Sequence, residues 1–176
     1  MLKYSLIFGG IIGIVVIAFM SVTLFTLGPD SAGTSELAGY ATMLAVLSLV
    51  FVGIKRFRDV EHGGVITFMR AAGVGIGIAA VAGIFYAISW EGVLLATDFA
   101  FIETYGQSQI DAIRAEGLAA AEEAARIAEI EQGMEMYRDP LIRLPITFIE
   151  IFPVGLIVAL VSALILRNPK VLPSKG

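Results

Sequence analysis

The chain has 176 residues, of which 57% are hydrophobic, and its mean hydropathy is +0.86. Soluble domains average about 45 to 50% apolar residues, so the surplus predicts contact with lipid. The absence of cysteine excludes disulfides and iron–sulfur clusters, a single histidine excludes a multi-histidine metal site within one copy, and a net charge of −4 argues against nucleic-acid binding. We therefore expect a membrane protein with no cofactor and no resident metal.

The first two apolar runs predict the first two transmembrane spans. Residues 4–27 carry no charge, and at about 1.5 Å per residue they exceed the roughly 30 Å hydrocarbon core of a bilayer. This run is also longer than the roughly 7 to 15 apolar residues of a cleaved signal peptide, which predicts an uncleaved anchor. Residues 37–54 are likewise uncharged and just long enough to span, and they end at the basic residues Lys55, Arg56 and Arg58.

A third and a fourth span are predicted further along the chain. Residues 65–90 pass Arg70 near their start, are uncharged from there on, and end at Trp90, an aromatic residue of the kind that lies at a membrane interface. Residues 144–166 contain one charge, Glu150. Four spans place both termini on the same side of the membrane.

The distribution of lysine and arginine predicts which side that is. Eight of the twelve basic residues lie near the termini, in the loop at residues 55–64 or at its edge, whereas residues 28–36 have none. Residues 91–143 have four basic residues against eleven acidic ones. Basic residues near span ends are retained in the cytoplasm, so we expect both termini inside and residues 91–143 outside.

The polar segment at residues 91–143 is rich in alanine and glutamate, which predicts helix. We expect the third-span helix to continue outward past Phe99 to Gly106, and a second helix to return and end at Asp139–Pro140. The return helix carries an irregular heptad stripe, interpreted as an intramolecular seam, with a homo-oligomer seam as the alternative. Its positions are Ile110, Ile113, Gly117, Ala120, Ala124, Ile127, Glu131 and Met134.

Glu150 is the first candidate for a functional residue, because an ionisable side chain about six residues inside a span costs roughly 2 to 3 kcal/mol or more. Tyr86 and Thr23 are the polar residues expected at its depth. Pro153 and Gly155 predict a kink that frees a backbone acceptor beside the carboxyl group. Two roles stay open for Glu150: fastening helices together, or binding a ligand, proton or ion.

Small residues form strips in two predicted spans. Gly75, Ala79 and Gly83 are spaced four residues apart in the third span, and Gly9 and Gly13 are spaced in the same way in the first. Such strips let helix backbones approach closely in lipid. They predict close helix packing, without indicating which helix is the partner.

The remaining singled-out residues are basic. Lys55, Arg56 and Arg58 are interpreted as a topology signal with a secondary preference for anionic lipid. Arg70 is interpreted as a side chain that reaches cytoplasmic headgroups. His62, in a short glycine turn, is interpreted as a solvated loop histidine.

Five stretches, in this order, resemble the bacterial family known as domain of unknown function 4199. They are Gly39–Tyr40 and residues 51–59, 64–68, 147–156 and 160–166. The resemblance covers nearly the whole chain apart from the outer helix. It implies a small four-span protein of the bacterial inner membrane without an assigned activity, and it places Glu150 inside a family motif without supplying chemistry for it.

Together these features predict an all-α integral membrane protein with four transmembrane helices and an extracytoplasmic helical hairpin between the third and the fourth. The leading functional hypothesis is a non-enzymatic component that self-associates through its glycine strips and outer helix, or that serves as an accessory subunit of a membrane complex. The alternative is a small proton- or ion-coupled transporter or channel that uses Glu150. An enzyme is disfavoured because the sequence has no nucleophile–base pair and no set of metal ligands.

Overall fold

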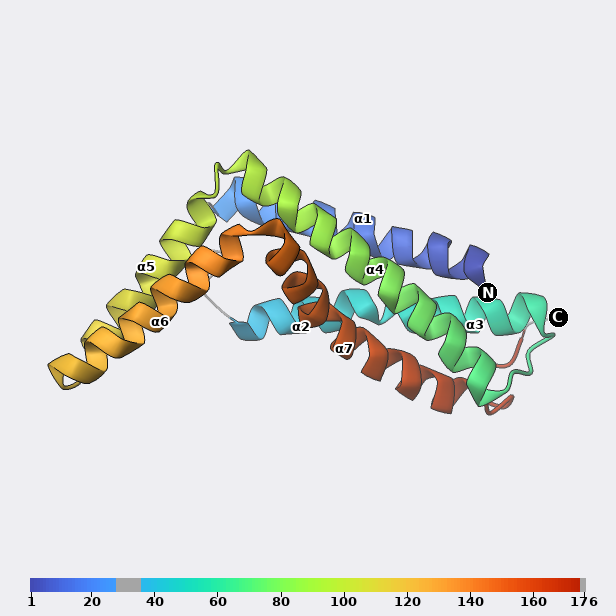
Figure 1. Cartoon of the computed structure of the whole chain (residues 1–176). Helices are drawn as coiled ribbons and strands as arrows, with labels where there is room; N and C mark the ends of the chain where they lie inside the picture. The colour runs from blue at the N-terminus through green and yellow to red at the C-terminus, as the bar shows by residue number, and fades with distance from the viewer. Residues whose placement is uncertain (28–35, 175–176) are drawn as a thin grey trace.

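The computed structural model describes residues 1–27 and 36–174, except for the side chains of residues 20, 21, 23–27 and 36–41. In this part of the chain all regular secondary structure is helical, which confirms the predicted all-α class (Figure 1). The helices are α1 (Leu2–Leu27), α2 (Glu36–Leu47), α3 (Leu49–Glu61), α4 (Phe68–Ala96), α5 (Ala100–Ala115), α6 (Ala120–Arg138) and α7 (Pro140–Leu166).

Three helices in the described ranges are long and apolar enough to cross a membrane. They are α4, α7 and the stretch Leu2–Phe19 of α1. A helix needs about 20 apolar residues to cross a bilayer, and the shortest of the three stretches has 18. Helices of this length and composition are typical of a membrane protein.

The predicted second span, residues 37–54, is divided between two helices. Ser48 separates α2 from α3, and its hydroxyl donates to the carbonyl oxygen of Ala45 at 2.6 Å. A serine bonded back to its own helix in this way commonly bends it. Figure 1 shows α2 and α3 end to end, and with 12 and 13 residues neither is long enough to span a bilayer by itself.

Helices α4 and α7 pack antiparallel through small residues spaced four apart. A Cβ added to Gly75 would lie 2.9 Å from the Cβ of Ala159, and one added to Gly155 would lie 2.9 Å from the Cβ of Ala79. Gly83 faces α7 one turn further along. The backbones are therefore as close as glycine permits, which is how helices associate in lipid without a hydrophobic driving force between them.

The opposite side of α4 is covered by α1. A Cβ on Gly9 would meet the Cβ of Val81 at 2.6 Å, and one on Gly13 would collide with the side chain of Phe85. Helix α4 is thus held between α1 and α7. The side chains that fill the centre of this bundle are fully buried and include Ile12, Leu47, Val50, Ile54 and Ile78.

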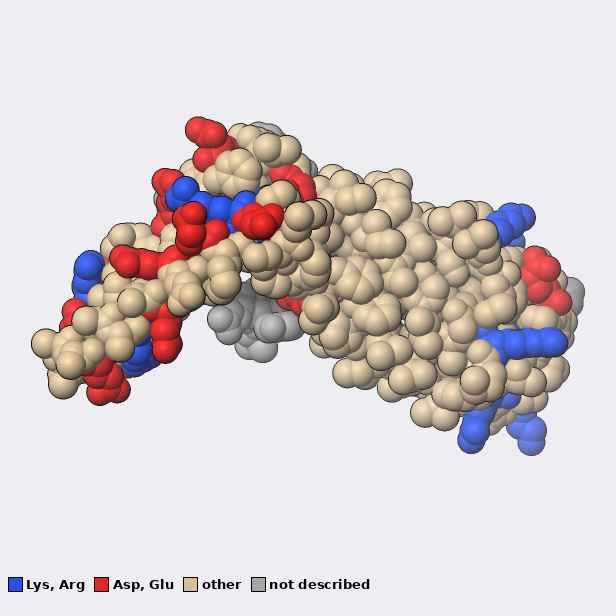
Figure 2. All heavy atoms as spheres, viewed as in Figure 1, with Lys and Arg blue, Asp and Glu red and all other residues tan. Residues whose placement is uncertain are grey.

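The bundle has an apolar outer surface between two charged ends. On the face shown in Figure 2, acidic and basic side chains gather over the arm that projects from one end and over the opposite end, with few between them. Large hydrophobic side chains are exposed along α1 and α7, among them Ile14, Val22, Ile149 and Ile157. Soluble proteins rarely expose such a continuous apolar surface.

Helices α5 and α6 form the arm, which projects at an angle to the bundle (Figure 1). Helix α4 ends at Ala96, and the chain turns at Asp98 and Phe99, which have φ values of 49° and 60°. Because two consecutive residues in the left-handed region end a helix, the expectation that the third-span helix continues to Gly106 is wrong. Gly106 lies within α5 and is buried against Met134 of α6.

The predicted return helix is also two helices. The chain reverses between α5 and α6 at Gly117, whose φ of +67° suits glycine, so the heptad stripe does not run along one helix. Ile110 and Ile113 are buried on α5, and Met134 of α6 lies across from Gly106 and lines the same hollow as Ile110. The stripe therefore marks the seam inside the arm.

Candidate functional site

The arm meets the bundle at a polar cluster that we call the arm junction: Trp90, Glu91, Phe99, Tyr137, Arg143 and Thr147. Arg143 is its centre and is only 2% exposed. Its Nε donates to one carboxylate oxygen of Glu91 and its Nη2 to the other, both at 2.6 Å. This bidentate pair joins the last turns of α4 to the first turns of α7, and such geometry is the strongest form of a charge-assisted hydrogen bond.

The remaining nitrogen of Arg143 binds the end of the arm. Its Nη1 donates to the carbonyl oxygens of Tyr137 at 2.9 Å and of Arg138 at 3.0 Å, which are among the last carbonyls of α6. The guanidinium carbon also lies 5.5 Å from the ring centre of Phe99 at the α4–α5 corner. One buried side chain thus contacts the bundle and both ends of the arm.

Neutral hydrogen bonds complete the junction. The indole N–H of Trp90 donates to the hydroxyl of Tyr137 at 2.9 Å, and this hydroxyl lies 3.4 Å from that of Thr147. Thr147 donates in turn to the carbonyl oxygen of Arg143 at 2.9 Å. Among the described residues, no buried side-chain polar atom lacks a partner. The junction therefore satisfies its own polar groups and links the arm to the bundle through several hydrogen bonds.

A second buried arginine lies at the opposite end of the bundle. Arg58 is fully buried, and its guanidinium donates to the carbonyl oxygens of Val171 at 2.9 Å and of Leu172, while its Nε donates to Asp59 at 2.8 Å. These contacts hold the segment after α7 against α3. The secondary preference for anionic lipid is therefore wrong for Arg58, since its charge is enclosed by protein, whereas its part in the topology signal stays a prediction.

Asp59 completes this contact, which we call the tail clamp (Lys55, Arg58 and Asp59 with residues 166–172). Lys55 forms an ion pair with Asp59 one helical turn away. Burial would raise the pKa of Asp59, but hydrogen bonds from Lys55 and Arg58 outweigh it and hold the pKa below its ordinary value. Asp59 therefore stays ionised between two cations.

The other basic candidates and His62 lie near the tail clamp. Arg56 and Arg70 are exposed, as a side chain that reaches headgroups would be. The His62 ring lies 5.0 Å from the ring of Phe57 in an edge-on contact, so this histidine packs against the bundle.

Glu150 lies on the exposed side of α7, apart from both clusters. No hydrogen bond or ion pair joins it to another residue that the structure describes. Tyr86 is half-buried and packs against the core, and the side chain of Thr23 lies outside the described residues. Helix α7 is unbroken through Pro153, and Gly155 is buried against Ala79, where it serves close packing.

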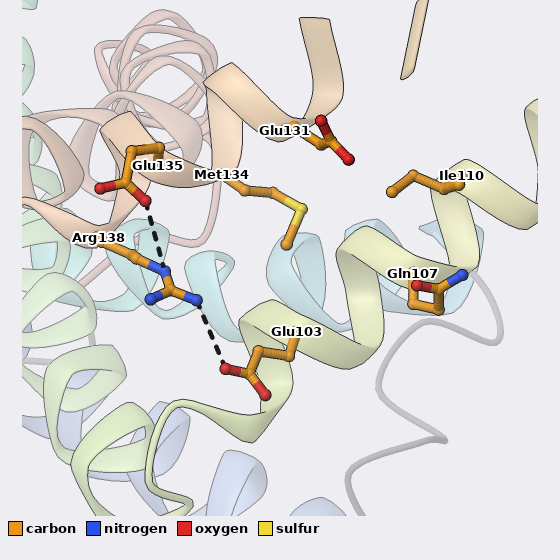
Figure 3. Close-up of a pocket in the computed structure, with 7 residues that line it drawn as sticks. All are labelled: Glu103, Gln107, Ile110, Glu131, Met134, Glu135 and Arg138. Atoms are coloured by element: carbon orange, nitrogen blue, oxygen red, sulfur yellow. Dashed lines mark hydrogen bonds and ion pairs between the residues drawn. The ribbon is translucent and has the colours of Figure 1, made fainter. Parts of the chain in front are cut away.

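The arm itself has a shallow hollow between its helices (Figure 3). Arg138 lies at its edge, 3.5 Å from an oxygen of Glu103 and 4.0 Å from one of Glu135. Met134 points into it from α6. The hollow follows the seam of the heptad stripe and is lined by Glu103, Gln107, Ile110, Glu131, Met134, Glu135 and Arg138.

The sequence did contain a signal for the junction. Glu91 directly follows the third predicted span, and Arg143 directly precedes the fourth. When these two spans pack antiparallel as neighbours, residues in those positions lie at the same level. Pairing charges across consecutive spans would therefore have identified Glu91 and Arg143 before the structure was known.

Comparison with known proteins gives a family. The chain has no match among curated proteins or among solved structures. A family model described as protein of unknown function (DUF4199) matches residues 7–168, a range that includes the arm junction and Glu150. The resemblance found in the sequence is thereby confirmed, and the chain belongs to the DUF4199 family.

Proposed function

We propose that this protein is a non-enzymatic accessory subunit of a complex in the bacterial cytoplasmic membrane, and that it binds its partner through the α5–α6 arm. The arm junction is the observation that carries this proposal. Helices α4 and α7 are antiparallel neighbours, so a connection of about 2 to 8 residues would suffice to join them. The chain instead builds an arm from residues 97–139 and fixes it to the bundle through Arg143.

Four spans are part of the proposal, with α2 and α3 together forming the second. Their end-to-end arrangement beside α7 supports this, as does the presence of both chain ends at the same end of the bundle (Figure 1). That end holds Lys3, Arg56 and Arg70. An excess of basic residues supports placing it in the cytoplasm, with the arm outside.

The accessory role is favoured over self-association through glycine strips. Gly9 and Gly13 contact α4, and Gly75 and Gly83 contact α7 or its neighbours. These strips are occupied within one copy of the chain, so they do not offer a surface to a second copy. The partner surface is placed on the arm for that reason.

The charges of the arm indicate what kind of partner it suits. Its arginines Arg114, Arg126 and Arg138 each form an ion pair with a carboxylate of the arm itself. Further acidic residues such as Glu122 and Glu129 are exposed on α6, which buries none of its residues. A partner with a basic surface complements this excess of negative charge, and such complementarity increases the association rate and the specificity.

Deletion of the arm tests the proposal. Residues 97–139 are replaced by a six-residue glycine–serine linker, and both proteins are purified from native membranes in mild detergent. We expect one defined protein to copurify with the intact chain in fixed stoichiometry and to be absent from the arm-less chain. Recovery of the intact chain alone, or of the same partner with the arm-less chain, would contradict the proposal.

The orientation is tested separately. Because the chain has no cysteine, single-cysteine variants can be labelled without background. We expect a membrane-impermeant maleimide to label Glu129→Cys on intact spheroplasts and to label Arg56→Cys only after lysis. The reverse pattern would place the arm in the cytoplasm.

A second candidate function rests on Glu150, whose carboxylate lies on an apolar face of α7. In this alternative, the protein is a small proton- or ion-coupled transporter or channel that uses Glu150 as its carrier group. Flux in liposomes that disappears in Glu150→Gln would support it. Absence of flux from correctly inserted protein would remove it.

A further inference from the structure

The side of α7 that faces away from the bundle is apolar except at one position. We call it the free face of α7; it comprises Ile146, Ile149, Glu150, Pro153, Ile157 and Val161, all exposed. Ile149 and Ile157 are 63% and 61% exposed. In a four-span membrane protein this face meets lipid, so the carboxyl group of Glu150 is surrounded by hydrocarbon.

Glu150 is too deep to reach the interface at the arm junction. It follows Arg143 by seven residues, which at about 1.5 Å per residue places it about 10 Å further into the bundle. A glutamate side chain is much shorter than a lysine or an arginine and does not extend over that distance. An acidic group at this depth normally faces a bundle interior or pairs with another group.

A second hydrogen-bond acceptor lies beside it. Pro153 has no N–H, so it cannot donate to the carbonyl oxygen of Ile149, four residues earlier in the helix. The free face therefore offers a carboxyl group and a backbone carbonyl within one turn. Among the described residues neither has a donor from another helix.

In a second copy, residues 4–22 of α1 and 144–166 of α7 include no lysine or arginine. Its exposed membrane surface along α1 carries aliphatic and aromatic residues such as Leu6, Ile7, Ile14 and Phe19. Its α7 brings the same two acceptors. Two ionised carboxylates would repel each other in a two-fold contact, so a cation for Glu150 has to come from a different polypeptide.

We propose that the free face of α7 docks a transmembrane helix of a different subunit that carries a lysine or an arginine at the level of Glu150. The cation pairs with the carboxylate, and its remaining N–H groups bind the carbonyl oxygen of Ile149. This inference rests on the membrane placement proposed above and adds a second contact to the partner complex, distinct from the arm. In this proposal Glu150 fastens helices together, as one of the two roles left open by the sequence, and the helices belong to different subunits.

Synthetic transmembrane helices provide a defined probe. The full chain, labelled with a donor dye at Gln132→Cys on the arm, is reconstituted in phosphatidylcholine vesicles. Synthetic leucine–alanine helices that carry an acceptor dye at one end are then added. One version has a lysine about 10 Å from its dye-labelled end, and the other has a leucine at the same position. Energy transfer as a function of helix density then gives the association constant of each helix.

We expect the lysine helix to bind about five- to thirtyfold more tightly than the leucine helix, as polar contacts between helices in membranes do. Glu150→Leu should abolish this preference, and Glu150→Gln, which keeps a neutral acceptor, should retain a small part of it. Both substitutions lie on an exposed face and leave the bundle contacts intact. Glu129→Gln, which removes an exposed carboxylate from the arm, is the matched control and should keep the full preference.

Two results would overturn the inference. The first is equal binding of the two helices to the unmodified chain, or a preference that survives Glu150→Leu. The second is efficient disulfide formation between two copies of the Ile146→Cys variant, with loss of that disulfide in the Ile146→Cys/Glu150→Gln double variant. This result would show that a second copy of the chain occupies the free face of α7. Maleimide labelling of the same vesicles shows whether the chain is inserted, so failed docking by an inserted chain is distinguished from failure of the membrane placement itself.

Discussion

Arg143 shows how much of this fold depends on a single side chain. It is nearly fully buried and binds Glu91 and the last carbonyls of α6 simultaneously. A buried ion pair adds little net stability compared with an apolar pair, but removal of one partner leaves an uncompensated charge in a poorly solvated position. The effect of substituting Arg143 should therefore be large.

We expect Arg143→Ala to lower the free energy of unfolding by about 3 to 5 kcal/mol. Arg138→Ala is the matched control, since the Arg138 side chain is 55% exposed and its ion pairs should contribute less than about 1 kcal/mol. Denaturant titration in mixed micelles, followed by tryptophan fluorescence of Trp90, measures both. Similar losses in the two variants would show that the arm junction is not a special contact.

The tail clamp should respond to acid through Asp59. Its pKa is lower in the folded chain than in the unfolded one, so its contribution is fully present above the unfolded value of about 3.9 and is lost as the pH falls through the folded value.

We therefore expect residues 167–174 to become accessible to protease or to hydrogen exchange as the pH falls below about 4, before the bundle unfolds. In Asp59→Asn the same segment should be partly accessible already at pH 7, with little further change in acid. An acid transition that is unchanged in Asp59→Asn would assign it to another group.

At the scale of the helix, the small residues of α4 decide which elements meet. Gly75 faces both α7 and α3, because an added Cβ would lie 2.9 Å from the Cβ of Ala159 and 2.7 Å from the Cδ1 of Ile54. Gly10 of α1 has no such neighbour within 4 Å. Both glycines lie in apolar helices, so they form a matched pair for the same substitution.

Gly75→Ala should destabilise the bundle by about 1 to 3 kcal/mol, because the helices must move apart to accommodate the methyl group. Gly10→Ala should be neutral or stabilising by up to about 1 kcal/mol, because alanine favours helix. Unfolding in mixed micelles provides the measurement. A neutral Gly75→Ala would mean that α4 and α7 are less closely packed than described above.

Long helices lie where the third and fourth spans are predicted, but the connections differ from the prediction. Hydropathy placed the third and fourth spans at residues 65–90 and 144–166, and the helices there are Phe68–Ala96 and Pro140–Leu166. The corner at Asp98 and Phe99 was not predicted, because neither residue type requires a positive φ. The ring of Phe99 is held there by Arg143, a contact between residues distant in sequence.

For the molecule as a whole, the central question is whether the arm is rigid with respect to the bundle. Two cysteines introduced at Ala128 on the arm and Met69 on the bundle can carry spin labels, since both positions are exposed. We expect a single narrow distance distribution in the unmodified background. Arg143→Ala should broaden it, whereas Arg138→Ala should not; a broad distribution in the unmodified chain would show that the arm is flexible.

What the sequence determined by itself depends on local composition. Uncharged runs, their lengths and the segregation of charge predicted an all-helical membrane protein, because transfer into lipid is set residue by residue. Tertiary structure decided which elements meet. Gly75 and Gly83 pack against α7, Arg143 pairs with Glu91, and Arg58 binds the C-terminal segment. Glu91 and Arg143 are 52 positions apart, and Arg58 and Leu172 are 114 apart. Pairings over such separations follow from how the helices pack, which no short stretch of sequence encodes.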